Sequence, residues 1–406
     1  MHISSRVKEI SESITLKLNA KAVQMAESGI KVYNFTAGQL PHRPPQRFVE
    51  SIKTELDFLK SFQYAPVPGY PELRKKILMH FEKSRGVTLP QNEFDAVVSN
   101  GGKHALSNVL SCLVEIGDEV IVLSPYWLSY PEMIRFVKGV PVIVEGTFAN
   151  NYVPAVKDID KKLSPKTRAI IINSPSNPAG IHYSKEWMVS FAELMAKHPE
   201  IAIISDEIYF ELVHDGGRPY YYYQHNPNLL KQTIICDGVS KSLASTGLRI
   251  GWTIAPKSLS GAMGRLQGQS TSNACSLIQR ALIDFDFDGL RTFVEPINKH
   301  LQENAHLLQE KLEKYDLAQK KYPSLSAFYY LFDFADTPVH KKLKTTNDDA
   351  TDYSTVVAEQ LLEQQQVAVV PGGPFGAPNT FRLSLVNEKG PFSEGLERML
   401  AFINCK

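Results

Sequence analysis

This sequence is poor in the residues that would mark a secreted, metal-binding or membrane protein. Its four cysteines are far apart, and no CxxC or mixed His/Cys spacing occurs. Neither a disulfide framework nor a zinc site is therefore indicated, and we expect no metal, reduced thiols and a cytoplasmic location. No stretch approaches the ~20 apolar residues of a membrane-spanning helix, and residues 1–12 lack the apolar core of a signal peptide.

The sequence also lacks an excess of charge of either sign. It has 44 Lys and Arg against 43 Asp and Glu, which gives a formal net charge of +1. Proteins that bind nucleic acids or membrane surfaces usually carry a basic excess, so neither class of partner is expected. At ~100–200 residues per domain, a chain of 406 residues is long enough for two or three domains.

What the sequence does contain is a regular alternation of short apolar strands and helical stretches. Most of the strands are rich in Val and Ile without polar alternation, which is typical of strands covered on both faces. Helical stretches between such strands give βαβ units, so we predict an α/β fold with a mainly parallel sheet. The seven predicted strands are 96–99, 119–123, 141–144, 169–172, 201–204, 233–236 and 250–255.

After Lys257 the pattern changes to a smaller α+β segment. We predict a long helix at 290–315 that breaks or kinks at Pro296, and a charged loop at 341–349. Further helices are predicted at 272–285 and 353–364, and strands at 327–334, 367–370 and 381–386. The domains predicted are 46–290 and 291–406, with an N-terminal segment, 1–45, that joins the smaller domain.

One lysine lies in surroundings that suit a nucleophilic amine. Lys241 follows the strand at 233–236 and is flanked by small hydroxyl residues, with a glycine and a second cation, Arg249, further on. A neighbouring cation and partial burial lower the pKa of a lysine, and such an amine can attack an aldehyde. Taken alone, Ser-Lys-Ser is more typical of an ordinary surface lysine beside a turn.

Glycines and an aromatic residue follow the first two strands. Gly101 and Gly102 come after the strand at 96–99 and open a helix with Lys103, and the free N–H groups of such a helix start favour an anion. A plain strand–helix turn is the alternative. Trp127 follows the strand at 119–123, where its ring either packs in the core or stacks on a flat ligand ring.

Polar side chains also follow the fourth and fifth strands. Asn177 lies between two prolines that stiffen its loop, and its amide either donates to a ligand oxygen or forms an Asx-turn. Asp206 ends a buried strand, so its carboxylate needs a partner such as a pyridinium N–H, unless it caps the next helix. Tyr209, three residues further on, can reach the phenolic oxygen of the same ring.

Three further positions lie outside these strands. Gly38 is in a turn with Pro41, where glycine lets a ligand approach the backbone closely. Tyr64 is in a loop before a helix. Such a tyrosine more often buries its ring in the core than donates a hydrogen bond from its hydroxyl. Arg382 lies in a largely apolar strand, and its buried fork demands either a ligand carboxylate or an Asp or Glu of the chain.

Together and in this order, the motifs resemble those of the class I pyridoxal-phosphate aminotransferases of fold type I, and among them the prokaryotic aspartate aminotransferases. The likeness runs from about Ser4 to Phe402. It implies a large domain with a mainly parallel seven-stranded sheet between helices, a smaller α+β domain, and a homodimer with shared active sites. The matching pieces are YxPxxGxPELR, GGK, SPYWxSY, NSPxNPxG, SDEIY, SKSxxxTGxRIG and FRLS.

The resemblance also implies roles in binding pyridoxal 5′-phosphate. Lys241 would hold the cofactor covalently and move the proton, and Asp206 would pair with the pyridine nitrogen. Tyr209 and Asn177 would bond the ring oxygen, and Trp127 would stack on the ring beside the substrate. The cofactor phosphate would be held by Gly102, Lys103, Ser240, Arg249 and, from the other subunit, Tyr64.

The implied substrate site is less complete. Arg382, with Asn177 and the backbone of Gly38, would clamp the α-carboxylate of an amino acid. Where the family often has Gly-Glu-Pro-Asp-Phe, this chain has residues 38–42 as Gly-Gln-Leu-Pro-His, a change at the substrate mouth. Ser13 and Thr15 lie in a segment that resembles the N-terminal, substrate-side segment of the family, and this is the support for a dicarboxylic substrate.

We therefore predict an aminotransferase that acts on an L-amino acid and a 2-oxo acid, with aspartate and 2-oxoglutarate as the first choice. Aromatic amino acids, alanine or other amino acids are alternative substrates. A carbon–sulfur β-lyase on the same cofactor is an alternative reaction. The non-enzyme alternative is a ligand-sensing regulator on the same fold.

Overall fold

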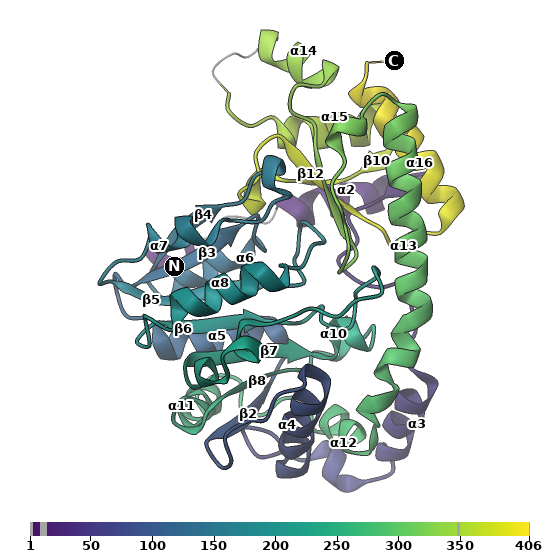
Figure 1. Cartoon of the computed structure of the whole chain (residues 1–406). Coiled ribbons are helices and arrows are strands. Elements are labelled where there is room, and N and C mark those ends of the chain that lie inside the picture. Colours follow the sequence, from purple (N-terminus) through teal and green to yellow (C-terminus); the bar gives the residue numbers. More distant parts are fainter. Residues whose placement is uncertain (1–2, 9–13, 347–349, 406) are drawn as a thin grey trace.

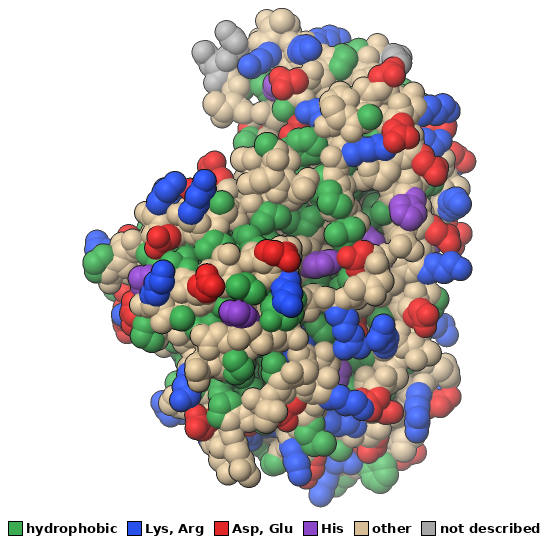
Figure 2. Space-filling model, viewed as in Figure 1, with side chains coloured by type: hydrophobic (Ala, Val, Ile, Leu, Met, Phe, Trp, Pro, Cys, Tyr) green, Lys and Arg blue, Asp and Glu red, His purple; other side chains and the backbone are tan. Residues whose placement is uncertain are grey.

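The computed structural model describes residues 3–8, 14–346 and 350–405. Figure 1 shows a large part built around one sheet and a smaller part stacked beside it, with a single long helix running along both. Lys and Arg side chains are interspersed with Asp and Glu over the face shown in Figure 2, as the near-neutral net charge predicts. In the described part of the chain, no helix has the length and apolar character needed to cross a membrane.

All seven predicted strands form one mixed sheet, which confirms the predicted α/β architecture. Its order is β2-β8-β7-β6-β5-β3-β4, and β8 runs in the direction opposite to the other six strands. The strands are β2 (Phe94–Ser99), β3 (Glu119–Ser124), β4 (Val140–Glu145), β5 (Thr167–Asn173), β6 (Ala202–Asp206), β7 (Thr233–Gly238) and β8 (Gly251–Pro256).

The sheet is buried on both faces because successive side chains of its strands enter two different cores. Ile170 and Ile172 of β5 belong to one apolar cluster, whereas Ala169 and Ile171 belong to the other. Every position along such a strand is therefore apolar, which explains the unbroken Val/Ile runs. The helices of the large part are α3 (Gln46–Glu55), α4 (Pro71–Arg85), α5 (Gly102–Leu113), α6 (Ser129–Phe136), α7 (Val156–Asp160), α8 (Lys185–Met195), α9 (Tyr222–His225), α10 (Val239–Ser242), α11 (Lys257–Gly268) and α12 (Ser276–Asp284).

The smaller part holds a three-stranded antiparallel sheet in the order β11 (Val370–Pro371), β12 (Thr380–Ser384) and β9 (Tyr329–Asp333). A second, two-stranded sheet pairs β1 (Tyr33–Asn34) with β10 (Val367–Ala368) in parallel, so the N-terminal segment lies against the C-terminal part of the chain. The remaining helices are α1 (Ser5–Lys8), α2 (Ile14–Glu27), α13 (Leu290–Lys314), α14 (Pro338–Thr346), α15 (Ser354–Gln365) and α16 (Lys389–Ile403).

Two details of this part differ from the sequence predictions. The long helix α13 is not broken at Pro296. Pro296 is exposed, so water can bond the carbonyl that its missing N–H leaves free, while Val294 and Ile297 stay buried. Residues 341–346 belong to α14 rather than to a loop, because Val339 and His340 anchor the helix in the core; residues 347–349 lie outside the described part.

Candidate active site

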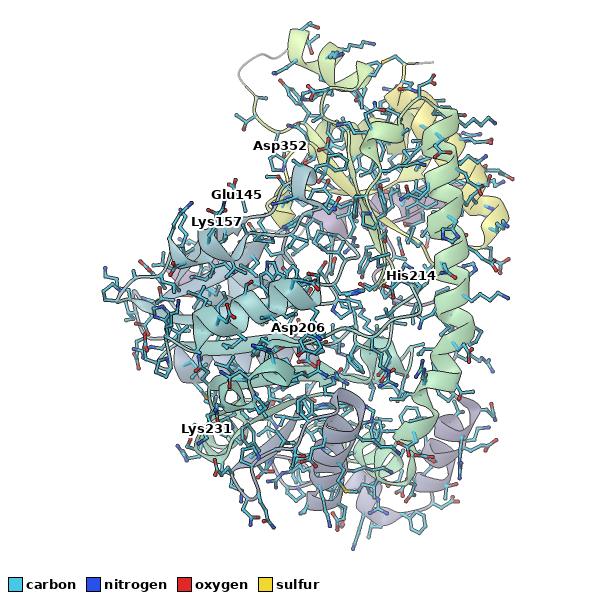
Figure 3. The ribbon with its side chains drawn as sticks, viewed as in Figure 1. Glu145, Lys157, Asp206, His214, Lys231 and Asp352 are labelled. Atoms are coloured by element: carbon cyan, nitrogen blue, oxygen red, sulfur yellow. The ribbon has the colours of Figure 1, made fainter. Side chains whose placement is uncertain are left out.

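The carboxyl ends of neighbouring parallel strands bring the predicted site residues to one edge of the large sheet. Asn173 at the end of β5 lies in register with Asp206 at the end of β6. The segments that follow β5, β6 and β7 carry Asn177, Tyr209 and Lys241 respectively. Figure 3 shows Asp206 in the interior of the molecule. This is the edge at which open α/β sheets bind ligands.

Lys241 lies in α10, a single helical turn directly after β7. Its Nζ donates a hydrogen bond of 2.5 Å to the carbonyl of Gly38 and lies 5.8 and 5.5 Å from the ring centroids of Tyr209 and Phe328. Burial lowers the pKa of this lysine to about 8, and the charges of two nearby arginines contribute. Such an amine is partly uncharged near neutral pH, as a nucleophile must be.

Asp206 is a buried carboxylate with no cation within ion-pair distance in the part of the chain described. Its Oδ2 accepts a hydrogen bond of 2.6 Å from the Tyr130 hydroxyl, and its Oδ1 accepts one of 3.3 Å from the backbone N–H of Ile208. Burial raises its pKa to about 6. The alternative in which Asp206 caps a helix is wrong, because a turn follows β6. A carboxylate in this position suits a pyridinium N–H.

Two potential donors to a ligand come from the turn after β6 and from the loop after β5. Tyr209 is buried in the turn after β6, and its hydroxyl lies 3.4 Å from that of Tyr329. The side-chain oxygen of Asn177 accepts a hydrogen bond of 3.0 Å from Arg382. The amide N–H₂ of Asn177 therefore remains the group that can donate to a ligand.

Arg382 provides a buried guanidinium at the same place. The residue is 5% exposed; its Nη1 donates to Asn177 and its Nη2 donates to the carbonyl of Thr36 at 3.1 Å. Its Nε has no hydrogen-bond partner. No Asp or Glu among the described residues pairs with it, so the alternative of an internal acidic partner is wrong. The free edge of the fork fits a ligand carboxylate.

A cradle for an anion lies where β2 turns into α5. Gly101 has φ +87°, and a Cβ there would lie 2.6 Å from Nη2 of Arg249, so only glycine lets the arginine come this close. α5 starts at Gly102 without a side-chain cap, which leaves backbone N–H groups for a ligand. Burial and Arg249 lower the pKa of Lys103. Ser240, one residue before the lysine of α10, is buried.

Trp127 follows β3 and lies partly exposed at the sheet edge rather than inside the core. Its ring meets the ring of Tyr130 edge-on, with centroids 5.4 Å apart and an interplanar angle of 87°. The Nζ of Lys103 lies 4.9 Å from the centroid of the Trp127 ring. The indole therefore stands between the anion cradle and the residue that bonds Asp206.

Comparison with known proteins decides the family. Residues 30–390 match the family model described as aminotransferase class I and II. The chain is 32% identical over 406 residues, all of both chains, to aspartate aminotransferase of Geobacillus stearothermophilus. It is 35% identical to aspartate/prephenate aminotransferase of Thermus thermophilus, with 98% of this chain and 97% of that protein covered. The structure of the Thermus thermophilus aspartate aminotransferase with maleate has a TM-score of 0.86, 33% identity and coverage of 98% of each chain.

The chain belongs to the class I and II aminotransferases. Enzymes of this family depend on pyridoxal phosphate, and the fold is that of the fold type I enzymes. The aminotransferase offers a partner for the two charged groups of that cofactor and for its reactive aldehyde. A carboxylate without a cation, Asp206, suits the pyridine nitrogen; the amine of Lys241 suits the aldehyde; and the cradle at Gly102 suits the phosphate. The residues present therefore fit the cofactor.

Not every predicted residue of the aminotransferase lies in this cluster. The side chain of Tyr64 is 88% exposed, so its prediction as a core aromatic is wrong. In the described residues no hydrogen bond joins it to the site. Ser13 lies outside the described residues, and so does the side chain of Thr15. No set of three or more His, Cys, Asp or Glu side chains in the described ranges is placed to hold a metal ion.

The structure also adds residues that the sequence motifs did not single out. Tyr130 bonds Asp206 directly, and its place three residues after Trp127, on the same face of one turn, was the available signal. Asn173 accepts the backbone N–H of Asn177 at 2.9 Å and donates to the carbonyl of Asp206 at 3.0 Å. Tyr329, in β9 of the smaller part, contacts Tyr209, and no local sequence pattern predicts this contact.

Proposed function

We propose that this aminotransferase moves the amino group of L-aspartate to a 2-oxo acid, with 2-oxoglutarate as the acceptor. The observation that carries the proposal is Arg382, a buried guanidinium with a free Nε and no acidic partner in the described part of the chain. Such a group needs the carboxylate of a ligand, and both substrates carry one next to the reacting carbon. The names of the Geobacillus and Thermus relatives support aspartate.

The proposed roles follow from the geometry of the side chains. When bound, pyridoxal phosphate supplies an electron sink for the bond broken at the substrate Cα. Lys241 Nζ would hold the cofactor aldehyde and, when free, would take the proton from the substrate Cα and donate it again. Asp206 keeps the pyridine nitrogen protonated. Arg382 would bind the α-carboxylate and so orient the substrate in the site.

The remaining side chains hold the cofactor in place. We propose that Tyr209 and the amide of Asn177 donate to the ring oxygen and that Trp127 stacks on the ring. The anion cradle, with Gly102, Lys103, Ser240 and Arg249, would bind the phosphate, which needs cations and free N–H groups. Gly38, whose carbonyl accepts from Lys241, would leave its backbone open to the substrate.

A homodimer is part of the proposal. The segment 56–64 exposes Leu56, Phe58, Leu59, Phe62 and Tyr64 by 48, 48, 72, 68 and 88%. A run of large exposed apolar residues of this kind favours burial against another chain. We propose that a second copy covers it and that Tyr64 then reaches the phosphate site of that copy.

The domain division and the location are proposals too. The pairing of β1 with β10 supports an N-terminal segment, 1–45, that joins a smaller domain, 291–406, beside a large domain, 46–290. The four cysteines are free, which supports a reducing, cytoplasmic setting.

The test is a half-reaction screen of the holoenzyme. Each amino acid is added without an oxo acid, and the loss of the visible absorbance of the bound cofactor is followed in time. We expect L-aspartate to react faster than alanine and the aromatic amino acids, and Arg382→Met to slow every amino acid by at least ~100-fold. A faster reaction with an aromatic amino acid would overturn the aspartate assignment.

Two extensions of the screen address other reactions. The name of the Thermus relative includes prephenate, so prephenate joins 2-oxoglutarate among the acceptors to be tested. A carbon–sulfur β-lyase would release pyruvate, ammonia and a thiol from a thioether amino acid, and the same site chemistry permits it. Release of thiol at a rate above that of aspartate turnover would favour the lyase.

A further inference from the structure

Tyr329 is a buried tyrosine whose hydroxyl has another tyrosine hydroxyl as its neighbour. The residue lies in β9 and is 1% exposed. Among the described residues, its only hydrogen-bonding neighbour is the hydroxyl of Tyr209, 3.4 Å away. A phenol paired only with another phenol adds little stability over phenylalanine, and Phe328 and Phe332 show that this segment accepts phenylalanine. Packing alone therefore does not account for the hydroxyl.

The ring of Tyr329 has a second contact, on its face. The Cζ of Arg382 lies 4.3 Å from the ring centroid, closer than to the ring of Phe375 at 5.3 Å. A guanidinium over an aromatic face at this distance is held by the charge distribution of the ring. No Asp or Glu in the described chain pairs with Arg382. Its guanidinium is therefore positioned by stacking on the Tyr329 ring and by its hydrogen bonds to Asn177 and Thr36.

The backbone of Tyr329 is itself held rigidly against the loop that carries Asn177. A Cβ at Gly180 would lie 2.0 Å from the carbonyl oxygen of Tyr329, so the two backbones pass in close contact. Ser324 Oγ donates to the same carbonyl at 3.0 Å. The side chain thus projects from a fixed point towards Tyr209 and Arg382, and its hydroxyl oxygen is 4.0 Å from where a Cβ on Gly38 would stand.

We propose that Tyr329 is a positioning residue that serves both halves of the site. Its ring face seats the Arg382 guanidinium, and its hydroxyl donates a hydrogen bond to the Tyr209 oxygen when the Tyr209 proton is donated to the cofactor. The inference rests on the proposed roles of Arg382 as carboxylate clamp and Tyr209 as donor to the cofactor ring oxygen. A donated bond at the Tyr209 oxygen strengthens the bond that Tyr209 donates in turn. One residue of the smaller part then affects both the substrate affinity and the hydrogen bonding of the cofactor ring oxygen.

The ring and the hydroxyl can be tested separately. Tyr329→Phe removes the hydroxyl and keeps the ring face, whereas Tyr329→Leu removes both. The matched control is Tyr330→Phe on the opposite face of β9, where the hydroxyl donates to the Lys320 carbonyl at 3.0 Å and accepts the Tyr322 N–H at 3.3 Å. If the leucine variant does not fold, Tyr329→Met takes its place.

Two readouts on each holoenzyme report the two contacts without turnover. The first is the pH midpoint of the visible absorbance of the bound cofactor. The second is the Kd of maleate, a dicarboxylate without an amino group that binds a Thermus relative. With fewer hydrogen-bond donors, the oxygen on the cofactor ring becomes more basic. A proton shared with that oxygen is then held more tightly, and the pH midpoint of the cofactor absorbance moves up.

The expected results form a crossed pattern. Tyr329→Phe raises the midpoint by about 0.3–0.5 pH unit and leaves the maleate Kd within about twofold of wild type. Tyr329→Leu raises the midpoint similarly and weakens maleate binding by about fivefold. Tyr330→Phe lowers the melting temperature but changes neither readout.

Other outcomes overturn the inference. An unchanged midpoint in Tyr329→Phe removes the role of the hydroxyl, and an unchanged maleate Kd in the leucine variant removes the role of the ring. A shift of both readouts in Tyr330→Phe shows that general loosening of β9 is responsible. Failure of the proposed function is distinguishable, because then Arg382→Met itself would bind maleate as tightly as wild type.

Discussion

The hydroxyl of Tyr130 donates a 2.6 Å hydrogen bond to the carboxylate of Asp206, deep beneath the edge of the sheet. Burial nevertheless raises the pKa of Asp206 to about 6. One neutral donor and one backbone N–H are too little to stabilise a buried charge fully. The Asp206 carboxylate therefore suits a cationic group of a ligand. Without the cofactor, its uncompensated charge destabilises the folded protein.

Replacement of Asp206 by Asn tests this directly in protein stripped of cofactor. Because the folded state raises this pKa, the stability that the group contributes is full below about pH 4 and is lost as the pH rises through about 6. We expect Asp206→Asn to be more stable than wild type by about 1–3 kcal/mol at pH 8 and by much less at pH 5. Urea unfolding at both pH values measures the difference.

The same variant should bind pyridoxal phosphate at least ~10-fold more weakly, since the ion pair with the pyridine nitrogen is lost. Titration of the stripped protein with cofactor provides the value. An Asp206→Asn protein that is destabilised equally at both pH values, or that retains full cofactor affinity, would contradict the assignment.

The pKa of Lys241, about 8, predicts a pH dependence for cofactor attachment. Only the uncharged amine attacks an aldehyde, so the rate at which the visible band forms should rise with pH and level off above about 8. Lys241→Ala should form no such band and lose at least ~10⁴-fold in turnover. Lys157→Ala, an exposed lysine marked in Figure 3, is the control and should behave as wild type.

A mixed-dimer experiment tests whether Tyr64 acts in the site of the other subunit. Tyr64→Phe should weaken cofactor binding by about tenfold, the effect of one hydrogen bond to an anion. Subunits with Tyr64→Phe are mixed with Lys241→Ala subunits. If Tyr64 acts across the dimer, each mixed dimer has one site with both changes and one intact site of wild-type affinity. If no intact site appears, Tyr64 acts within its own chain.

A buried ion network beneath the site predicts a large effect on stability. Arg85 at the end of α4 donates from Nε to Glu207 at 2.9 Å and from Nη2 to Asp237 at 3.2 Å. Arg85→Met leaves both carboxylates uncompensated and should lower the free energy of unfolding by about 3–5 kcal/mol. Adding Glu207→Gln to this variant should recover part of the loss, because it removes one of the two buried charges.

The same helix offers the control for that prediction. Lys83, two residues before Arg85, pairs with Asp288 at the surface, where both side chains are mostly exposed. Lys83→Met should change the melting temperature little, because solvent screens such a pair. A similar loss in the Lys83 and Arg85 variants would contradict the role given to burial.

The seven strands could be predicted from the sequence because a strand between two cores must be apolar at every position. The Val/Ile runs around Ile170 and Ile203 carry that requirement locally. The continuity of the long helix at Pro296 and the helical state of residues 341–346 could not be predicted, because there tertiary packing outweighs a local preference for a break or a loop.

The amino-acid sequence by itself determined the sheet, the family and the chemical types gathered at the strand ends, since each depends on short runs of neighbouring residues. Only the tertiary structure decided how deep Asp206 lies and what the Arg382 fork touches. Arg382 and its partner Asn177 are 205 residues apart, and Tyr209 and Tyr329 are 120 apart. Contacts over such separations form when two sheets pack together, and no local pattern encodes them.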